Sequence, residues 1–190
     1  PTPLHWLLAD KNRAFVIEAT AGGLRIYDNQ IGVLTNNPPF PSMLDHLNNY
    51  INLSPDPAVD RFSPRQELTA VSRGMGAMGL PGDLSSQSRF VRAAFTKLNA
   101  VTRDTPEDSV SQFFHILGAV EQQRGCAKLP DGSYEITAYT SCMNTDKGIY
   151  YYTTYENHCI AAVDMHRCDL EGKELYMYPL IKKQEVIRQN

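Results

Sequence analysis

The chain has 190 residues, and its 18 Lys and Arg against 21 Asp and Glu give a formal net charge of −3. Hydrophobic residues make up 42% of it and charged residues 21%, as in a globular rather than a disordered protein. The negative balance and the lack of a Lys/Arg cluster exclude a basic nucleic-acid surface, and no apolar run approaches the roughly 20 residues needed to cross a bilayer. We therefore expect a single domain over residues 1–190, with no nucleic-acid and no membrane partner.

Cysteine and histidine patterns give no support for a metal or a cofactor. The four cysteines, Cys126, Cys142, Cys159 and Cys168, form no CxxC pair, and no HExxH motif occurs. Scattered thiols without a signal peptide predict reduced, buried cysteines in a cytoplasmic protein.

The first 35 residues have a β pattern. The segments "LHWLLAD", "AFVIEAT", "LRIYD" and "IGVLT" are rich in β-branched and large apolar residues and are separated by turn sequences. They predict four short antiparallel strands. The proline-rich "NNPPFPS" then ends the sheet, and Ser42 is expected to cap a helix whose apolar face holds Met43, Leu44, Leu47 and Tyr50.

A polar loop is expected over residues 54–66, followed by the glycine-rich "SRGMGAMGLPGD" at 72–83. Its glycines lack the GxGxxG spacing of a dinucleotide site, so they predict close backbone packing rather than phosphate binding.

Two helices and a second group of strands follow. "LSSQSRFVRAAFTKLN" predicts one helix, and Thr105 followed by Pro106 marks the start of another. His115, on the second helix, is expected to be a packing residue. The segments "YEITAYTSCMN", "GIYYYTTYE" and "CIAAVDM" then predict three strands, so the order strands, helices, strands indicates an α+β layered domain.

Two segments combine polar side chains with apolar neighbours, "LTNNP" at 34–38 and "LPGDLSSQSRF" at 80–90. An asparagine amide at a strand end and an arginine near a helix start are suited to stabilising the charges of acyl transfer. The simpler interpretation is an asparagine turn and an arginine that pairs with Asp83. The residues alone leave both open.

Longer stretches resemble the choloylglycine hydrolase family, which contains bile salt hydrolases and penicillin V acylases. The resemblance covers nearly the whole chain in order, and rests on "PLHWLLAD", "GVLTNNPPFPSMLDHLNNY", "SRGMGAMGLPGDLSSQSRFVRAAF" and "YTSCMNTDKGIYYYTTYENHCIAAVDM". It implies an αββα sandwich of the N-terminal nucleophile hydrolase type, incomplete in this chain. The implied reaction is hydrolysis of the amide of a glycine- or taurine-conjugated bile salt, without a cofactor, by a homotetramer.

The same resemblance assigns roles to residues. The family's oxyanion asparagine corresponds to Asn36, and its late arginine corresponds to Arg89. A loop arginine, Arg73, is a candidate for contacting the amino-acid head group of the substrate, with a solvated arginine as the alternative.

The chain departs from the family at the nucleophile. The family uses an N-terminal cysteine whose own α-amino group is the base, whereas this sequence has Pro1 and no cysteine with a free α-amino group. We therefore expect it to be the C-terminal part of a family protein and inactive alone. A penicillin V acylase and a noncatalytic remnant or binding domain are the alternatives.

Overall fold

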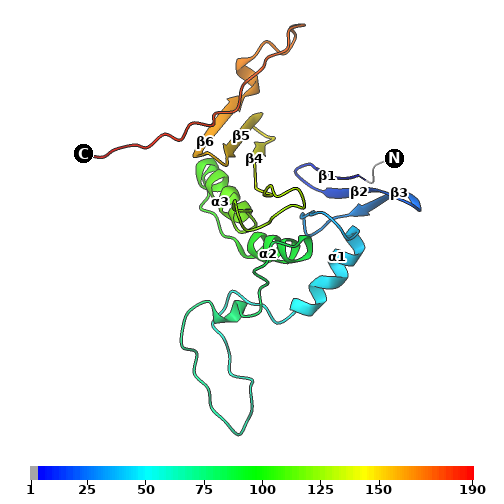
Figure 1. Ribbon diagram of the computed structural model, residues 1–190, viewed down its shortest axis with the longest axis vertical. Coiled ribbons are helices and arrows are strands. Elements are labelled where there is room, and N and C mark those ends of the chain that lie inside the picture. Colours follow the sequence, from blue (N-terminus) through cyan, green and yellow to red (C-terminus); the bar gives the residue numbers. More distant parts are fainter. Residues whose placement is uncertain (1–3) are drawn as a thin grey trace. The chain divides into compact units, whose positions relative to one another are not determined.

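The computed structural model describes residues 4–190, which fall into two compact units, one ending at Ala100 and the other beginning at Val101. Each unit contains one antiparallel three-stranded sheet and at least one helix (Figure 1). The predicted α+β class is therefore confirmed, whereas the single domain over 1–190 stays a prediction. Within the described residues, no helix has the length and apolar content to cross a membrane.

The sheet of the first unit contains β1 (His5–Ala9), β2 (Ala14–Thr20) and β3 (Gly23–Asp28), in that order. Three of the four expected strands are thus confirmed, but the fourth, "IGVLT", is not a strand. Its backbone is held by the buried side chain of Asn29 instead, which donates to Val33 O at 3.0 Å and accepts from Gly32 N at 2.8 Å. Hydrogen bonds to a side-chain amide here take the place of the backbone bonds that a neighbouring strand would make.

Two helices complete the first unit, α1 (Phe40–Leu47) and α2 (Ser86–Asn99). The prediction that Ser42 caps α1 is wrong, because the helix already begins at Phe40, after Pro39. A proline is tolerated in the first turn of a helix, so Pro41 does not delay the start. Tyr50 lies beyond α1, in the 3₁₀ segment η1 (Asn48–Tyr50).

The core of the first unit lies between one face of the sheet and these helices. Phe40 is the link, since its ring lies 6.0 Å from that of Tyr27 on β3 and 6.3 Å from that of Phe90 on α2. The fully buried side chains are Phe40, Phe90, Met43, Val16 and Val91. The opposite sheet face is apolar but exposed, and includes Trp6, Leu8, Leu24 and Ile26.

A long connection between η1 and α2 contains the 3₁₀ segment η2 (Met75–Ala77) and extends away from α1 and α2 in Figure 1. The expected close packing is confirmed at only one of the four glycines of residues 72–83. An added Cβ at Gly76 would clash with Asp56 O, whereas one at Gly74, Gly79 or Gly82 would meet nothing within 4 Å. Ser54 N also donates to Gly76 O at 3.0 Å. The two ends of the loop are therefore joined at Gly76.

The second unit contains α3 (Pro106–Gly118) and the sheet β4 (Tyr139–Asn144), β5 (Ile149–Thr154) and β6 (Asn157–Asp164), followed by η3 (Met165–Arg167). All three C-terminal strands are confirmed. Thr105 caps α3 as predicted, since its Oγ1 accepts from Asp108 N at 3.2 Å.

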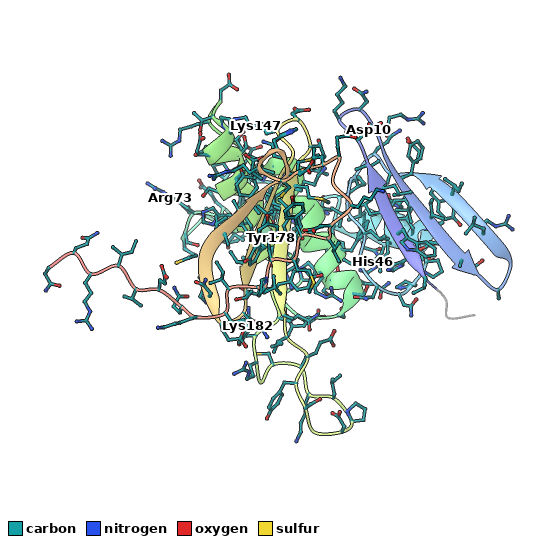
Figure 2. The ribbon with its side chains drawn as sticks, turned by 90° about the horizontal axis from the view of Figure 1, so that it is seen from above. Asp10, His46, Arg73, Lys147, Tyr178 and Lys182 are labelled. Atoms are coloured by element: carbon teal, nitrogen blue, oxygen red, sulfur yellow. The ribbon has the colours of Figure 1, made fainter. Side chains whose placement is uncertain are left out.

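A tail without helix or strand follows η3 and passes Tyr178 and Lys182 (Figure 2). It is attached to the sheet by Thr154 Oγ1, which donates to Ile181 O at 3.0 Å, and by Ile181 N, which donates to the hydroxyl of Tyr152 at 3.2 Å.

Two expectations about side chains in this unit are wrong. All four cysteines are free, but only Cys142 is buried, and burial raises the pKa of its thiol. Cys126 lies exposed in a turn, and Cys159 lies exposed on the edge strand β6. His115 is also exposed rather than packed, and it lines an open cavity of about 250 Å³ between α3 and the sheet together with Thr140.

Candidate active site

Asn36 lies in the connection between β3 and α1. Its neighbour Thr35 fixes this segment to the start of α2, since Thr35 Oγ1 donates to Ser86 O at 3.0 Å and accepts from Ser86 Oγ at 3.1 Å. Asn36 itself is exposed. The segment is thus tied to a rigid helix at the residue before the candidate amide.

Arg89 lies in the first turn of α2, where the side chain of Ser85 caps the helix by accepting from Ser88 N at 3.3 Å. The guanidinium is half-buried and donates through Nε to Leu84 O at 3.0 Å. Its Nη2 donates to Asn36 Oδ1 at 2.6 Å across 53 residues of sequence. The two residues assigned by resemblance therefore meet in space.

This contact fixes the direction of the Asn36 amide. Because Oδ1 accepts from a cation, the bond is charge-assisted and holds the oxygen toward Arg89. The Nδ2 group then points elsewhere, and within residues 4–190 it donates to no acceptor. An amide N–H with no protein acceptor beside it is suited to binding an oxygen of a ligand.

The alternative pairing of Arg89 with Asp83 is wrong. The Asp83 carboxylate accepts from Ser85 N at 2.9 Å and from Ser88 Oγ at 2.5 Å. Hydrogen bonds from Ser85 and Ser88 hold the pKa of Asp83 far below its usual range. Arg92 contacts the same turn through the backbone oxygen of Asp83 at 2.6 Å. Asp83 therefore belongs to the cap of α2, which leaves Arg89 to reach Asn36.

Arg73 is not brought to this pair. It is exposed in the loop before η2. Within the described chain it makes no hydrogen bond or ion pair, and it lines an open cavity of about 520 Å³ with Pro55 and Pro57. Its predicted contact with the substrate head group stays a prediction.

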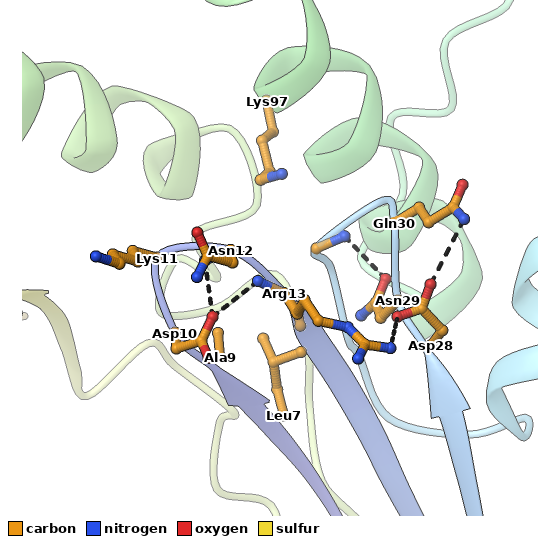
Figure 3. Close-up of a pocket in the computed structure, with 12 residues that line it drawn as sticks. Leu7, Ala9, Asp10, Lys11, Asn12, Arg13, Asp28, Asn29, Gln30 and Lys97 are labelled. Carbon is orange, nitrogen blue, oxygen red and sulfur yellow. Dashed lines mark hydrogen bonds and ion pairs between the residues drawn. The ribbon is translucent and has the colours of Figure 1, made fainter.

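A second cavity, of about 450 Å³, lies at the β1–β2 turn and is lined by neither Asn36 nor Arg89 (Figure 3). Most of its charged groups already have partners, since Arg13 lies 3.6 Å from Asp28 and Lys97 Nζ donates to Ile31 O at 2.8 Å. Asp10 accepts from the backbone N–H groups of Asn12 and Arg13, which lower its pKa. We therefore interpret this cavity as a hydrogen-bonded turn rather than a reaction site.

Local sequence patterns do not predict the residues that support the site. The segment "LSSQS" predicts a helix cap, but it does not predict that Ser86 is bonded to Thr35 in a distant segment.

Residues 4–190 contain no group of three or more His, Cys, Asp or Glu side chains arranged to hold a metal ion.

Comparison with solved structures defines the class of fold. A point mutant of the conjugated bile acid hydrolase from Clostridium perfringens aligns with a TM-score of 0.87 and 39% identity, over 98% of this chain and 57% of the other. The penicillin V acylase from Agrobacterium tumefaciens aligns with a TM-score of 0.67 and 20% identity, over 87% and 46%, which shows likeness of fold alone. The fold is that of the N-terminal nucleophile hydrolases, as expected.

Sequence comparison defines the family. Residues 1–178 match the linear amide C–N hydrolases of the choloylglycine hydrolase family, and the chain belongs to this family. It is 56% identical to a bile salt hydrolase/transferase of Lactiplantibacillus plantarum over 94% of its length, and 41% identical to one of Clostridium perfringens over 93%. It covers only 55% and 54% of these two relatives, so it spans about half of their length.

Proposed function

We propose that this chain forms part of an amidase that hydrolyses glycine- or taurine-conjugated bile salts. In this proposal the cysteine nucleophile comes from the part of the family's length that the chain does not span. Asn36 supplies an oxyanion donor, and Arg89 holds it. The observation that carries the proposal is the 2.6 Å bond from Arg89 Nη2 to Asn36 Oδ1.

The reaction begins when the cysteine thiolate attacks the amide carbonyl carbon. A carbon–sulfur bond forms, and the carbonyl π electrons move to the oxygen, which becomes negatively charged. The Nδ2 hydrogens of Asn36 stabilise this oxygen. When the intermediate collapses, the carbon–nitrogen bond breaks and the α-ammonium group of the nucleophile protonates the departing glycine or taurine. Water then attacks the thioester, releases the bile acid and restores the thiol.

Arg89 contributes to this reaction through Asn36. An unanchored asparagine amide can rotate by about half a turn and present its oxygen instead of its N–H₂ group. An oxygen facing the developing oxyanion would repel it. The guanidinium prevents that rotation because it offers only donors, and Oδ1 is the acceptor within reach.

The proposal is tested with a chimera in which the unmatched part of the Lactiplantibacillus plantarum relative is joined to this chain. Release of glycine, taurine and phenoxyacetate is measured with glycocholate, taurocholate and phenoxymethylpenicillin. We expect hydrolysis of the conjugated bile salts to be preferred. A preference for the penicillin would favour the penicillin V acylase alternative. A folded chimera that hydrolyses none of them would favour a noncatalytic domain.

A further inference from the structure

A buried carboxylate lies behind the candidate site and takes no part in the proposed chemistry. Glu18 is on β2 and only 4% exposed, on the sheet face that also buries Val16. Its Oε1 lies 3.9 Å from Nδ1 of His5, the residue opposite it on β1. Its Oε2 has no hydrogen-bond partner among the described residues. Burying a carboxylate with one oxygen unpartnered is costly, so the side chain calls for an explanation.

Among residues 4–190, the Glu18 side chain accepts from one backbone group, the N–H of Phe40, which donates to Oε1 at 2.9 Å. This is the first N–H group of α1, because Pro39 before it and Pro41 after it have none. The next two, on Ser42 and Met43, donate to Pro39 O. No side chain from within the helix caps α1. Glu18 therefore anchors the start of α1 from a neighbouring strand.

Phe40 is joined to Asn36 by a short and stiff connection. Only Asn37, Pro38 and Pro39 intervene, and the two prolines restrict the backbone dihedrals. Phe40 is also 1% exposed and packs against Phe90, the residue after Arg89. A shift of Phe40 is therefore passed to both members of the Asn36–Arg89 pair.

We infer that Glu18 is a positioning residue, which holds the Asn36 amide in register with Arg89 by anchoring Phe40 N–H. The segment is then fixed on both sides of Asn36, by Thr35 on Ser86 and by Phe40 on Glu18. Its importance for turnover rests on the proposed function of Asn36, whereas its effect on the geometry does not.

The test measures the Arg89 guanidinium resonances by ¹H–¹⁵N NMR in the chimera, with Asn36→Ala defining the signal of the broken bond. Glu18→Leu removes the acceptor, and Glu18→Asp withdraws it from Phe40 while keeping the charge. We expect both to give the Asn36→Ala signal. Glu18→Gln keeps an acceptor at Oε1 and should restore the wild-type signal. Val16→Ala, a buried substitution on the same strand and face, should leave it unchanged.

The inference is overturned if Glu18→Asp or Glu18→Leu keeps the wild-type Arg89 signal, or if Val16→Ala loses it equally. Glu18→Asp decides the matter should Glu18→Leu not fold. In the chimera, Glu18→Asp should lower kcat by up to about 10²-fold with little change in KM. If Asn36→Ala leaves turnover intact, the proposed function fails, and the NMR result still decides the role of Glu18.

Discussion

At the scale of single residues, the site depends on which atoms of Asn36 are already occupied. The guanidinium of Arg89 takes the amide oxygen, and the amide nitrogen is left to donate. The same guanidinium also donates through Nε to Leu84 O, so two of its own N–H groups fix its position. A planar fork of this kind cannot be replaced by a single ammonium group.

Replacing Arg89 therefore tests how the amide is oriented. We expect Arg89→Lys in the chimera to keep the positive charge but to lose one of the two contacts, and to lower kcat about tenfold or more. The measurement is kcat and KM for glycocholate. Lys97→Arg, on the outer end of the same helix, is the matched control and should leave both parameters unchanged. Wild-type turnover in Arg89→Lys would show that charge alone is sufficient.

Asp83 provides a test by pH. Hydrogen bonds from Ser85 and Ser88 lower its pKa in the folded protein. A carboxyl with a lowered folded pKa stabilises the fold above its unfolded pKa of about 3.9, and that contribution is lost as the pH falls toward the folded value. We therefore expect Asp83→Asn to lower the urea midpoint of this chain at about pH 6, and the difference from wild type to shrink by about pH 3. A difference that grows at low pH would contradict this assignment.

At the scale of elements, the two predicted helix starts show when neighbouring residues are sufficient to determine where a helix begins. Thr105 and Pro106 mark the beginning of α3 correctly, because cap and first-turn preferences act within a few residues. The start of α1 is not at Ser42 as predicted. Its first N–H group is bound by Glu18, which lies on β2 and is 22 residues away in sequence. A buried acid in a strand cannot be distinguished from a surface one by its neighbours in sequence.

The cap of α3 can be tested by substitution. Thr105→Ala removes the acceptor for Asp108 N and should lower the free energy of unfolding by about 1 kcal/mol. Thr105→Ser keeps the hydroxyl and should restore most of it. Urea unfolding followed by circular dichroism measures both. Equal stability of the wild type and Thr105→Ala would show that the cap does not contribute.

The contact at Gly76 gives a second test at this scale. A methyl group there would meet the backbone oxygens of Asp56 and Ser54, whereas one at Gly74 would meet nothing within 4 Å. We expect Gly76→Ala to separate the ends of the loop and to speed tryptic cleavage at Arg61 and Arg65. Gly74→Ala, where φ is +79°, adds backbone strain alone and should have the smaller effect. The reverse order of cleavage rates would refute the close packing at Gly76.

Part of the fold and little of the site could be predicted from the sequence. Most strands and the start of α3 followed from local patterns. The exceptions are the start of α1 and "IGVLT", whose backbone is held by the Asn29 side chain. The meeting of Asn36 with Arg89 joins residues 53 apart, and no periodicity encodes it. Only the resemblance to a family predicted that pair. The supporting bonds from Thr35 and Glu18 depend on the folded geometry, and so local sequence patterns do not predict them.

At the scale of the whole molecule, the outer face of the first sheet is unusual. Trp6, Leu24 and Ile26 are 44%, 62% and 64% exposed on the face opposite the core. Exposed apolar surface of this kind promotes association. We expect the 190-residue chain alone to bind a hydrophobic dye and to sediment as more than a monomer. Ile26→Lys should reduce both, whereas Arg25→Lys, on the other face of the same strand, should not. A monodisperse monomer that binds no dye would contradict this expectation.

The central claim is that the Asn36 amide donates to the oxyanion, and kcat of the chimera with glycocholate tests it most directly. Asn36→Ala should lower kcat by about 10²–10³, the usual loss for one oxyanion donor. Asn37→Ala, which alters the adjacent exposed amide, should stay near wild type. Near-normal turnover in Asn36→Ala, or an equal loss in Asn37→Ala, would contradict the account.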